Sequence, residues 1–279
     1  MKPIKYEAWD GSYPAVVLGM PNSDYHAHPA ISKSGLDLIH RSPAHYQYGA
    51  KREATRAMAI GSAIHCAILE PERFSVDYLL LRDVKDRRAS EYKQACKVHD
   101  PEYVLTGKEA DNVAGMQESV RSQYSMPAGE AEVSVFAECP NTGVAVKCRF
   151  DLLTYAGHAV DLKKTQESSR DAFAKSVYNY RYHVQDAWYR FVYELATGKA
   201  LESFTFLAVE EQPPHVAMPY ELGGESLTIG HNEAMADLEQ YAECMETNDW
   251  PGYERTDEPL ELPAWALAQY ENDLIEEIH

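Results

Sequence analysis

The sequence has 279 residues, of which 45% are hydrophobic, and its formal net charge at pH 7 is −18. This length and composition predict a compact globular protein with a sizeable core. The sequence contains no run of about 18 apolar residues, so no membrane span is expected. The strong negative charge argues at first against a nucleic-acid partner.

The N-terminal half is expected to be mainly helical. Residues 1–30 are rich in Pro, Gly, Asn and aromatic residues, which indicates an irregular lead-in. A serine at position 32 can cap the first helix, and Ala-rich composition indicates the second. Helices are predicted over 32–46 with a Ser-Pro break, over 53–69 ending before Pro71, and over 107–124 after a mixed, charged segment at 82–97.

The C-terminal half combines strands with two long helices. Three apolar, β-branched runs separated by turn residues predict an antiparallel meander over 131–137, 144–153 and 159–165. An apolar stripe predicts one long helix over 170–197, ending at Gly198. A strand at 203–209 and a helix at 225–247 follow. We therefore expect a single α/β domain over 1–279, with an N-terminal helical part.

The cysteines indicate a reducing environment. There are five, and no two form a C-x-x-C pair, which argues against a disulfide framework, a structural zinc site or an Fe–S cluster. The N-terminus has no apolar segment typical of a signal peptide. A cytoplasmic location is therefore expected.

The charge is distributed unevenly along the chain. Residues 131–190 contain eight Lys or Arg and seven Asp or Glu, whereas residues 241–279 contain one Arg and eleven acids. The acidic C-terminal tail is thus either a solvated surface or a segment that meets a basic partner and keeps DNA from the outer face. Nucleic acid remains a possible ligand for the more neutral middle of the chain.

The stretch CRFDLLTYAGHAVDLKKT, residues 148–165, carries the main chemical signal. Because side chains alternate along a strand, Asp161 and Lys163 share a face while Leu162 points into the core. Pairing of the two strands would bring Asp151 close to Asp161, and a divalent cation such as Mg²⁺ can hold such a pair of carboxylates. A nearby lysine can hold a phosphate oxygen or position water. The alternative is a hairpin with ordinary polar ends, and Lys164 should point away from the acids.

Three further features favour a site. His65 lies on the Ala-rich helix one turn after Gly61, although a lone histidine is more often structural. Gln185 and Tyr189 are four residues apart and share a helix face, although such residues often only flank a core. Basic residues that follow the hairpin could contact a DNA backbone or simply be solvated; they are Lys164, Arg170, Lys175 and Arg181.

These motifs resemble a known group of enzymes. GSAIH at 61–65, RFD at 149–151, VDLKKT at 160–165 and QDAWY at 185–189 occur in the order found in RecB-type nucleases of the PD-(D/E)xK superfamily. The resemblance is stronger to the C-terminal nuclease domain of the RecE (exonuclease VIII) family and spans about residues 30–270. It rests on YRYHVQDAWY at 180–189, the start at 32–36, Trp250-Pro251 and Leu262-Pro263 with Trp265.

The resemblance implies a PD-(D/E)xK nuclease fold, with a central mixed β-sheet that contains the meander and is flanked by helices. It implies a Mg²⁺-dependent exonuclease with two metal ions per site, which Mn²⁺ could replace. Such an enzyme degrades linear double-stranded DNA from 5′ ends and leaves 3′ overhangs for a RecT-type annealing protein. The family also implies a ring-shaped homo-oligomer, a tetramer, and the chain resembles a stand-alone phage or prophage form acting in a bacterial cell.

Carried over by position, the family's metal ligands correspond to His65, Asp151, Asp161 and the backbone carbonyl of Leu162. A glutamate contributes in the family, and both Glu132 and Glu138 are candidates, with Glu132 favoured. Lys163 corresponds to the catalytic lysine, and Gln185 and Tyr189 to the pair beside it. Arg87 and Arg88 lie in a segment where DNA contacts are also expected. The rival functions are another nuclease of the superfamily, either a structure-specific endonuclease or a single-strand exonuclease, and a non-catalytic DNA-binding module.

Overall fold

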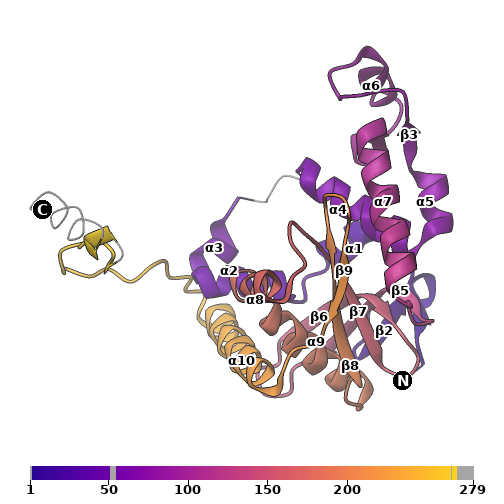
Figure 1. Ribbon diagram of the computed structural model, residues 1–279. Helices are drawn as coiled ribbons and strands as arrows, with labels where there is room; N and C mark the ends of the chain where they lie inside the picture. Colours follow the sequence, from indigo (N-terminus) through magenta and orange to yellow (C-terminus); the bar gives the residue numbers. More distant parts are fainter. Residues whose placement is uncertain (1, 51–54, 265, 269–279) are drawn as a thin grey trace, which may run out of the picture.

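A seven-stranded mixed sheet organises the chain (Figure 1). The computed structural model describes residues 2–50, 55–264 and 266–268. The strand order is β1-β2-β5-β6-β7-β8-β9, with β1 parallel to β2, β7 parallel to β8, and the other neighbours antiparallel. The strands are β1 (Ile4–Lys5), β2 (Ala15–Leu18), β5 (Glu130–Glu138), β6 (Ala145–Leu153), β7 (His158–Thr165), β8 (Ser203–Glu210) and β9 (Ala217–Tyr220).

The predicted meander is present as β5, β6 and β7, because these runs are largely apolar and buried and are separated by turns. The expectation of an irregular lead-in over 1–30 was incomplete. The run AVVL at 15–18 is an interior strand that pairs with β5, and its first three residues are buried. Four residues between Pro14 and Gly19 are too short a pattern to stand out from the surrounding turn residues.

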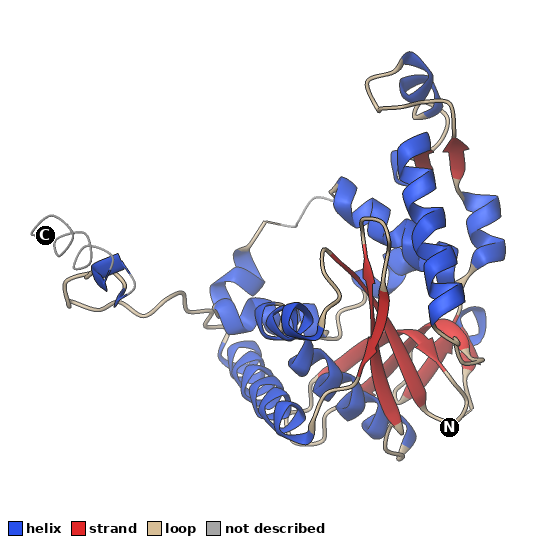
Figure 2. Cartoon of the chain, in the orientation of Figure 1, coloured by secondary structure: helices blue, strands red, loops and turns tan. Residues whose placement is uncertain are grey.

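Helices cover both faces of the sheet (Figure 2). On one face Trp188, Phe150 and Phe204 centre a core with α2 (Lys33–Arg41), α3 (Pro43–Tyr48), α9 (Tyr182–Thr197) and α10 (Gly224–Thr247). On the other face, Ile64 of α4 (Arg56–Leu69) and Met116 of α7 (Gly107–Gln123) pack on Leu162 and Leu207 of the sheet. The sheet is therefore buried on both sides along β7 and β8.

An arm projects from the second face between α4 and α7 (Figure 1). Its two short strands pair in parallel, with Leu79 opposite Val104, and the charged segment lies beyond them. The Thr106–Glu109 capping box and the Arg56–Glu109 ion pair fix the start of α7. The arm contains α5 (Pro71–Asp77), β3 (Leu79–Leu81), α6 (Ser90–Ala95), η2 (Pro101–Tyr103) and β4 (Val104–Thr106), while η1 (Tyr6–Ala8) and α1 (Asn22–Ala27) lie near the N-terminus.

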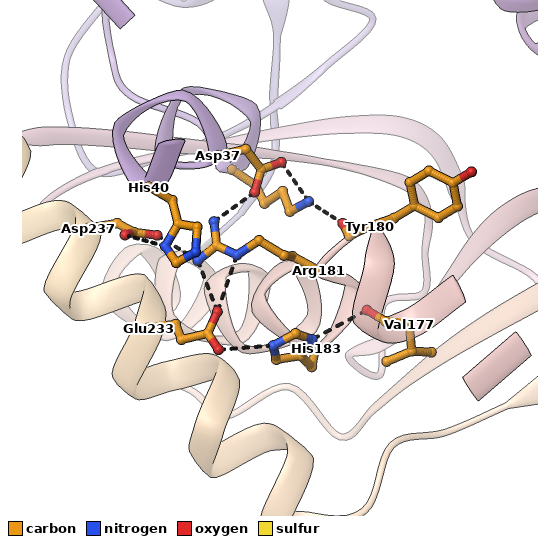
Figure 3. A network of polar contacts seen from close by, with 9 residues as sticks. Asp37, His40, Val177, Tyr180, Arg181, His183, Glu233 and Asp237 are labelled. Atoms are coloured by element: carbon orange, nitrogen blue, oxygen red, sulfur yellow. Dashed lines mark hydrogen bonds and ion pairs between the residues drawn. The ribbon is translucent and has the colours of Figure 1, made fainter. Parts of the chain in front are cut away.

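The prediction of one long helix over 170–197 was wrong. The chain breaks into α8 (Arg170–Asn179) and α9 at Arg181, which adopts a left-handed backbone with φ of 53°. The Arg181 guanidinium pairs with Asp37, Glu233 and Asp237 at 2.9, 3.1 and 2.6 Å (Figure 3). Because these carboxylates come from α2 and α10, the break is imposed by tertiary contacts that local periodicity does not contain.

The chain after α10 is anchored at Trp250 and then exposed. Trp250 packs into the core, and the described residues from Pro251 onward lie at the surface. Trp265 and residues 269–279 of the acidic tail lie outside the described residues, as do residues 51–54 at the expected start of α4. Within the described part, no helix is long and apolar enough to cross a membrane.

Close packing between α9 and α10 at Gly230 can be tested by substitution. A β-carbon on Gly230 would collide with the His183 carbonyl group, whereas one on Gly224 of the same helix would meet nothing. We expect Gly230→Ala to lower the free energy of unfolding by about 1–3 kcal/mol, despite the better helix propensity of alanine. Gly224→Ala is the matched control and should be neutral or slightly stabilising. Urea denaturation measures both, and equal stability of the two variants would contradict the packing described.

Candidate active site

The strands β6 and β7 separate where the acidic residues lie. Their pairing includes Leu152 opposite Val160 and Leu153 opposite Ala159, and the same register would place Asp151 opposite Asp161. The ladder ends before that pair. Instead, the backbone N–H of Leu162 donates a hydrogen bond of 2.7 Å to Oδ2 of Asp151. The side chain of Asp151 thus replaces a strand partner, and a gap opens between the strands.

Glu132 reaches the same gap through an unusual backbone conformation. Its φ is 55°, in the left-handed region, and this residue interrupts the pairing of β5 with β6 directly opposite Asp151. A non-glycine residue in this region is strained and persists only where its surroundings hold it. Here Arg149 holds the Glu132 carboxylate at 2.6 Å. Glu138, the other candidate, is exposed at the far end of β5.

The helix α4 supplies His65 from the other side of the gap. Thr55 caps this helix, and its Ala-rich face packs on the sheet, so His65 is directed at the strand ends. Nδ1 of His65 lies 3.3 Å from Oδ2 of Asp151. Among the described residues, His65, Glu132 and Asp151 form one cluster that could hold a metal ion, with ligand atoms all within 4.8 Å of one another.

Asp161 and Lys163 lie beside this group and are held by α9. Lys163 Nζ is 2.6 Å from Oδ2 of Asp161 and donates a hydrogen bond of 2.9 Å to Oε1 of Gln185. Nε2 of Gln185 donates in turn to Oδ1 of Asp161 at 2.5 Å. One amide therefore orients both charged groups. As expected from the strand alternation, Leu162 is buried in the core and Lys164 points away, to Glu211.

A cavity of about 850 Å³ opens onto the site. Gln185 and Tyr189 line it together, as their spacing on one helix face predicts. Two further cations contribute that the sequence did not single out. Arg149 lines the wall beside Glu132, and Lys33 of α2 lines the rim, where its Nζ bonds to the backbone oxygen of Tyr180 at 2.7 Å.

Mutual charge and burial shift the pKa values in the site. Burial lowers the pKa of His65, but the Asp151 carboxylate outweighs it and raises the value to about 9. Burial raises the pKa of Asp161 to about 6 although Lys163 opposes the shift. Burial and the charge of Asp151 also raise the pKa of Glu132. The site thus concentrates carboxylates whose ionised forms would gain from an additional cation.

The donor set suits a divalent metal ion. Carboxylate oxygens are the ligands that Mg²⁺ and Mn²⁺ prefer, and an imidazole nitrogen can bind divalent transition metals. Oδ2 of Asp161 is buried and, apart from its ion pair with Lys163, accepts no well-aligned hydrogen bond from a described residue. The N–H and C=O groups of one strand residue point to the same side, so the carbonyl of Leu162 faces the same gap as its N–H.

The predicted DNA-contacting residues have different surroundings. Arg87, Arg88, Arg170 and Lys175 are exposed. Arg181, in contrast, is enclosed by three carboxylates and only 13% of its side chain is exposed. Its charge is already neutralised within the protein, so Arg181, contrary to the expectation from the sequence, is not available to contact DNA.

Proton release should accompany metal binding. With a pKa of about 9, His65 is protonated at neutral pH in the metal-free protein, and a metal ion must displace that proton. We expect Mn²⁺ binding to release about one proton, and the affinity to rise as the pH approaches 9. Isothermal titration calorimetry in two buffers of different ionisation enthalpy measures this release.

The matched control is His65→Gln, which should abolish the release. The stability of the metal-free protein should also depend on pH through the same histidine. The contribution of the His65–Asp151 pair is full below the ordinary histidine pKa of 6.5 and is lost as the pH rises through about 9. Metal binding without any proton exchange in the parent protein would contradict this view of the site.

Comparison with known proteins places the chain in a family. The profile of a PDDEXK-like domain of unknown function (DUF3799) matches residues 32–258. No curated protein matches. Among solved structures, a candidate exonuclease from Eubacterium rectale has a TM-score of 0.58 at 14% identity, with 90% of this chain and 98% of that chain covered. The structure of SSO0001 has a TM-score of 0.29 at 13% identity, covers 66% of this chain and 86% of that chain, and is too distant to support any inference.

The similarity to the Eubacterium rectale protein concerns the fold alone, and it agrees with the mixed sheet flanked by helices. The expected PD-(D/E)xK fold is thereby confirmed. The family profile spans most of the chain and includes the site from His65 to Tyr189. The chain therefore belongs to the DUF3799 family of PDDEXK-like domains.

Proposed function

We propose that this protein is a metal-dependent nuclease that hydrolyses phosphodiester bonds in DNA. The observation that carries the proposal is the convergence of His65, Glu132 and Asp151 beside the Asp161–Lys163 pair. A carboxylate-rich centre with one adjacent lysine suits phosphodiester hydrolysis, because it can hold a divalent cation and contact a phosphate oxygen. The PDDEXK-like family match supports the same reaction class.

The residues would divide the work as follows. His65, Glu132, Asp151 and Asp161, with the carbonyl of Leu162, would hold Mg²⁺, and Mn²⁺ could replace it. When bound, such an ion polarises the phosphate and lowers the pKa of a bound water. Lys163 orients the attacking water or balances charge on the phosphate, and Gln185 fixes the position of Lys163. Tyr189 forms the wall of the cavity beside Gln185.

The finer activity rests on the motif resemblance to the RecE family. On that basis we propose digestion of linear double-stranded DNA from 5′ ends, two metal ions per site, a ring-shaped tetramer and a RecT-type annealing partner for the 3′ overhangs. Exposed cations on the arm and on α8 are the proposed contacts to the DNA backbone. They are Arg87, Arg88, Arg170 and Lys175.

The role of the charged pair on β7 leads to a first prediction of activity. Asp161→Asn and Lys163→Met should each reduce DNA hydrolysis by orders of magnitude. The first removes a proposed metal ligand, and the second removes the lysine that pairs with it. Lys164→Met is the matched control, since Lys164 pairs with Glu211 on the other face, and should keep activity. Initial rates on linear duplex DNA with Mg²⁺ test this. Near-parent activity of Asp161→Asn would refute the proposed site.

The choice of substrate separates the proposed activity from its rivals. An exonuclease should digest linear duplex DNA and leave covalently closed circles intact, whereas a structure-specific endonuclease would nick DNA without ends. Duplexes labelled at one 5′ or one 3′ end report polarity, and a single-stranded substrate tests the single-strand exonuclease. We expect early release of the 5′ label, only with Mg²⁺ or Mn²⁺. Binding of DNA without cleavage under any metal would favour a non-catalytic module.

A further inference from the structure

We propose that Tyr180 is a stacking platform for a terminal nucleobase of the strand being cut, so that the site takes an unpaired end nucleotide. The inference rests on the proposed function and adds to it how the end of the duplex is recognised. Tyr180 lies at the junction of α8 and α9, and 62% of it is exposed.

The ring of Tyr180 is the outermost layer of an aromatic stack. It packs on Tyr182 with ring centres 5.6 Å apart and an angle of 27° between the planes. Tyr182 packs in turn on Phe206 of β8, at 5.5 Å and 24°. Since Phe206 is fully buried, the stack connects the core to the surface, and its outer layer is left exposed.

The same stack leads directly to the proposed catalytic lysine. Lys163 Nζ lies 4.6 Å from the centre of the Tyr182 ring, in cation–π contact. Together with the stacking distance, this keeps the centre of the Tyr180 ring within about 10 Å of Lys163 Nζ. That span is comparable with the distance between a phosphate and the base of its own or the adjacent nucleotide. A phosphate beside Lys163 therefore brings a base within reach of Tyr180.

The backbone on the C-terminal side of Tyr180 is fixed by two contacts. Its carbonyl oxygen accepts a hydrogen bond from Lys33, which itself pairs with Asp37 at 2.7 Å. The next residue, Arg181, is held by three carboxylates, and the Tyr180 ring points away from that network (Figure 3). A fixed ring loses little conformational entropy when a base stacks on it, which favours binding.

This platform selects for an unpaired nucleotide. A base in a duplex is stacked between its neighbours and can reach an external ring only after leaving them, which is energetically costly. Stacking on an aromatic side chain offsets part of that cost and is tolerant of sequence because every base has a π-face. Tyr180 would therefore stabilise a frayed end of any sequence.

Fluorescence of 2-aminopurine tests the platform without requiring cleavage. The probe is a duplex whose terminal 2-aminopurine is left unpaired by a mismatch, placed at the 5′ end in one substrate and at the 3′ end in another. With Asp161→Asn, binding of one of these duplexes should quench the fluorescence severalfold. The double variant Asp161→Asn with Tyr180→Ala should bind the duplex with its fluorescence retained, and Tyr180→Trp should restore quenching.

Tyr178 is the matched control. It is 77% exposed and lies two residues away on α8, so Tyr178→Ala should change neither quenching nor kinetics. In the active protein, Tyr180→Ala should raise KM roughly 5- to 100-fold with kcat little changed. Quenching that persists in Tyr180→Ala, or that is absent when the Tyr180 protein binds the duplex, would overturn the proposal.

The test distinguishes failure of the platform from failure of the proposed function. Tyr180-dependent quenching by a parent protein that cleaves no DNA would leave the platform standing and refute the nuclease. DNA cleavage by Tyr180→Ala with an unchanged KM would support the nuclease and refute the platform. A protein that binds no DNA at all, measured by fluorescence anisotropy, would refute both.

Discussion

The site depends on one hydrogen bond, which the N–H of Leu162 donates to the carboxylate of Asp151. A sheet that opens between two interior strands would normally leave buried backbone donors without partners, at a cost of about 1–3 kcal/mol each. Asp151 satisfies one such donor from within the gap. The strands can therefore separate, and α4 and α9 reach the gap from opposite faces of the sheet with His65 and Gln185. Without this bond, continued pairing of β6 and β7 would close the space that the other residues share.

Charge in the site is balanced locally, although the chain is strongly acidic. Glu132 is paired with Arg149, Asp151 with His65, and Asp161 with Lys163. Each carboxylate therefore has one cation within 3.3 Å. The net charge of −18 resides mainly elsewhere, much of it in the C-terminal 39 residues. A phosphate that approaches the cavity meets a nearly neutral centre with lysine at its rim, so the overall charge does not exclude DNA from it.

The sequence predicted the parts of the structure that depend on local pattern. Apolar, β-branched runs separated by turn residues identified β5, β6 and β7, and the alternation of side chains along a strand correctly placed Lys163 and Lys164 on opposite sides. It could not predict the break at Arg181, because the left-handed backbone there depends on acids 144 and 52 to 56 positions away. It favoured Glu132 over Glu138 only as the residue that opens an apolar strand. The left-handed conformation that turns Glu132 toward His65 could not be predicted, because neighbouring elements impose it. The edge strand β9 escaped notice because it contains a proline.

The tip of the arm is bounded by one pair of short parallel strands, β3 and β4, with Leu79 opposite Val104. The chain between them returns to its starting point, so segments of different length or charge could replace it while β3 and β4 stay in register. A replacement of the tip would leave the sheet and the acids of the site unchanged. For the engineer, the same two strands mark where a foreign recognition module can be grafted.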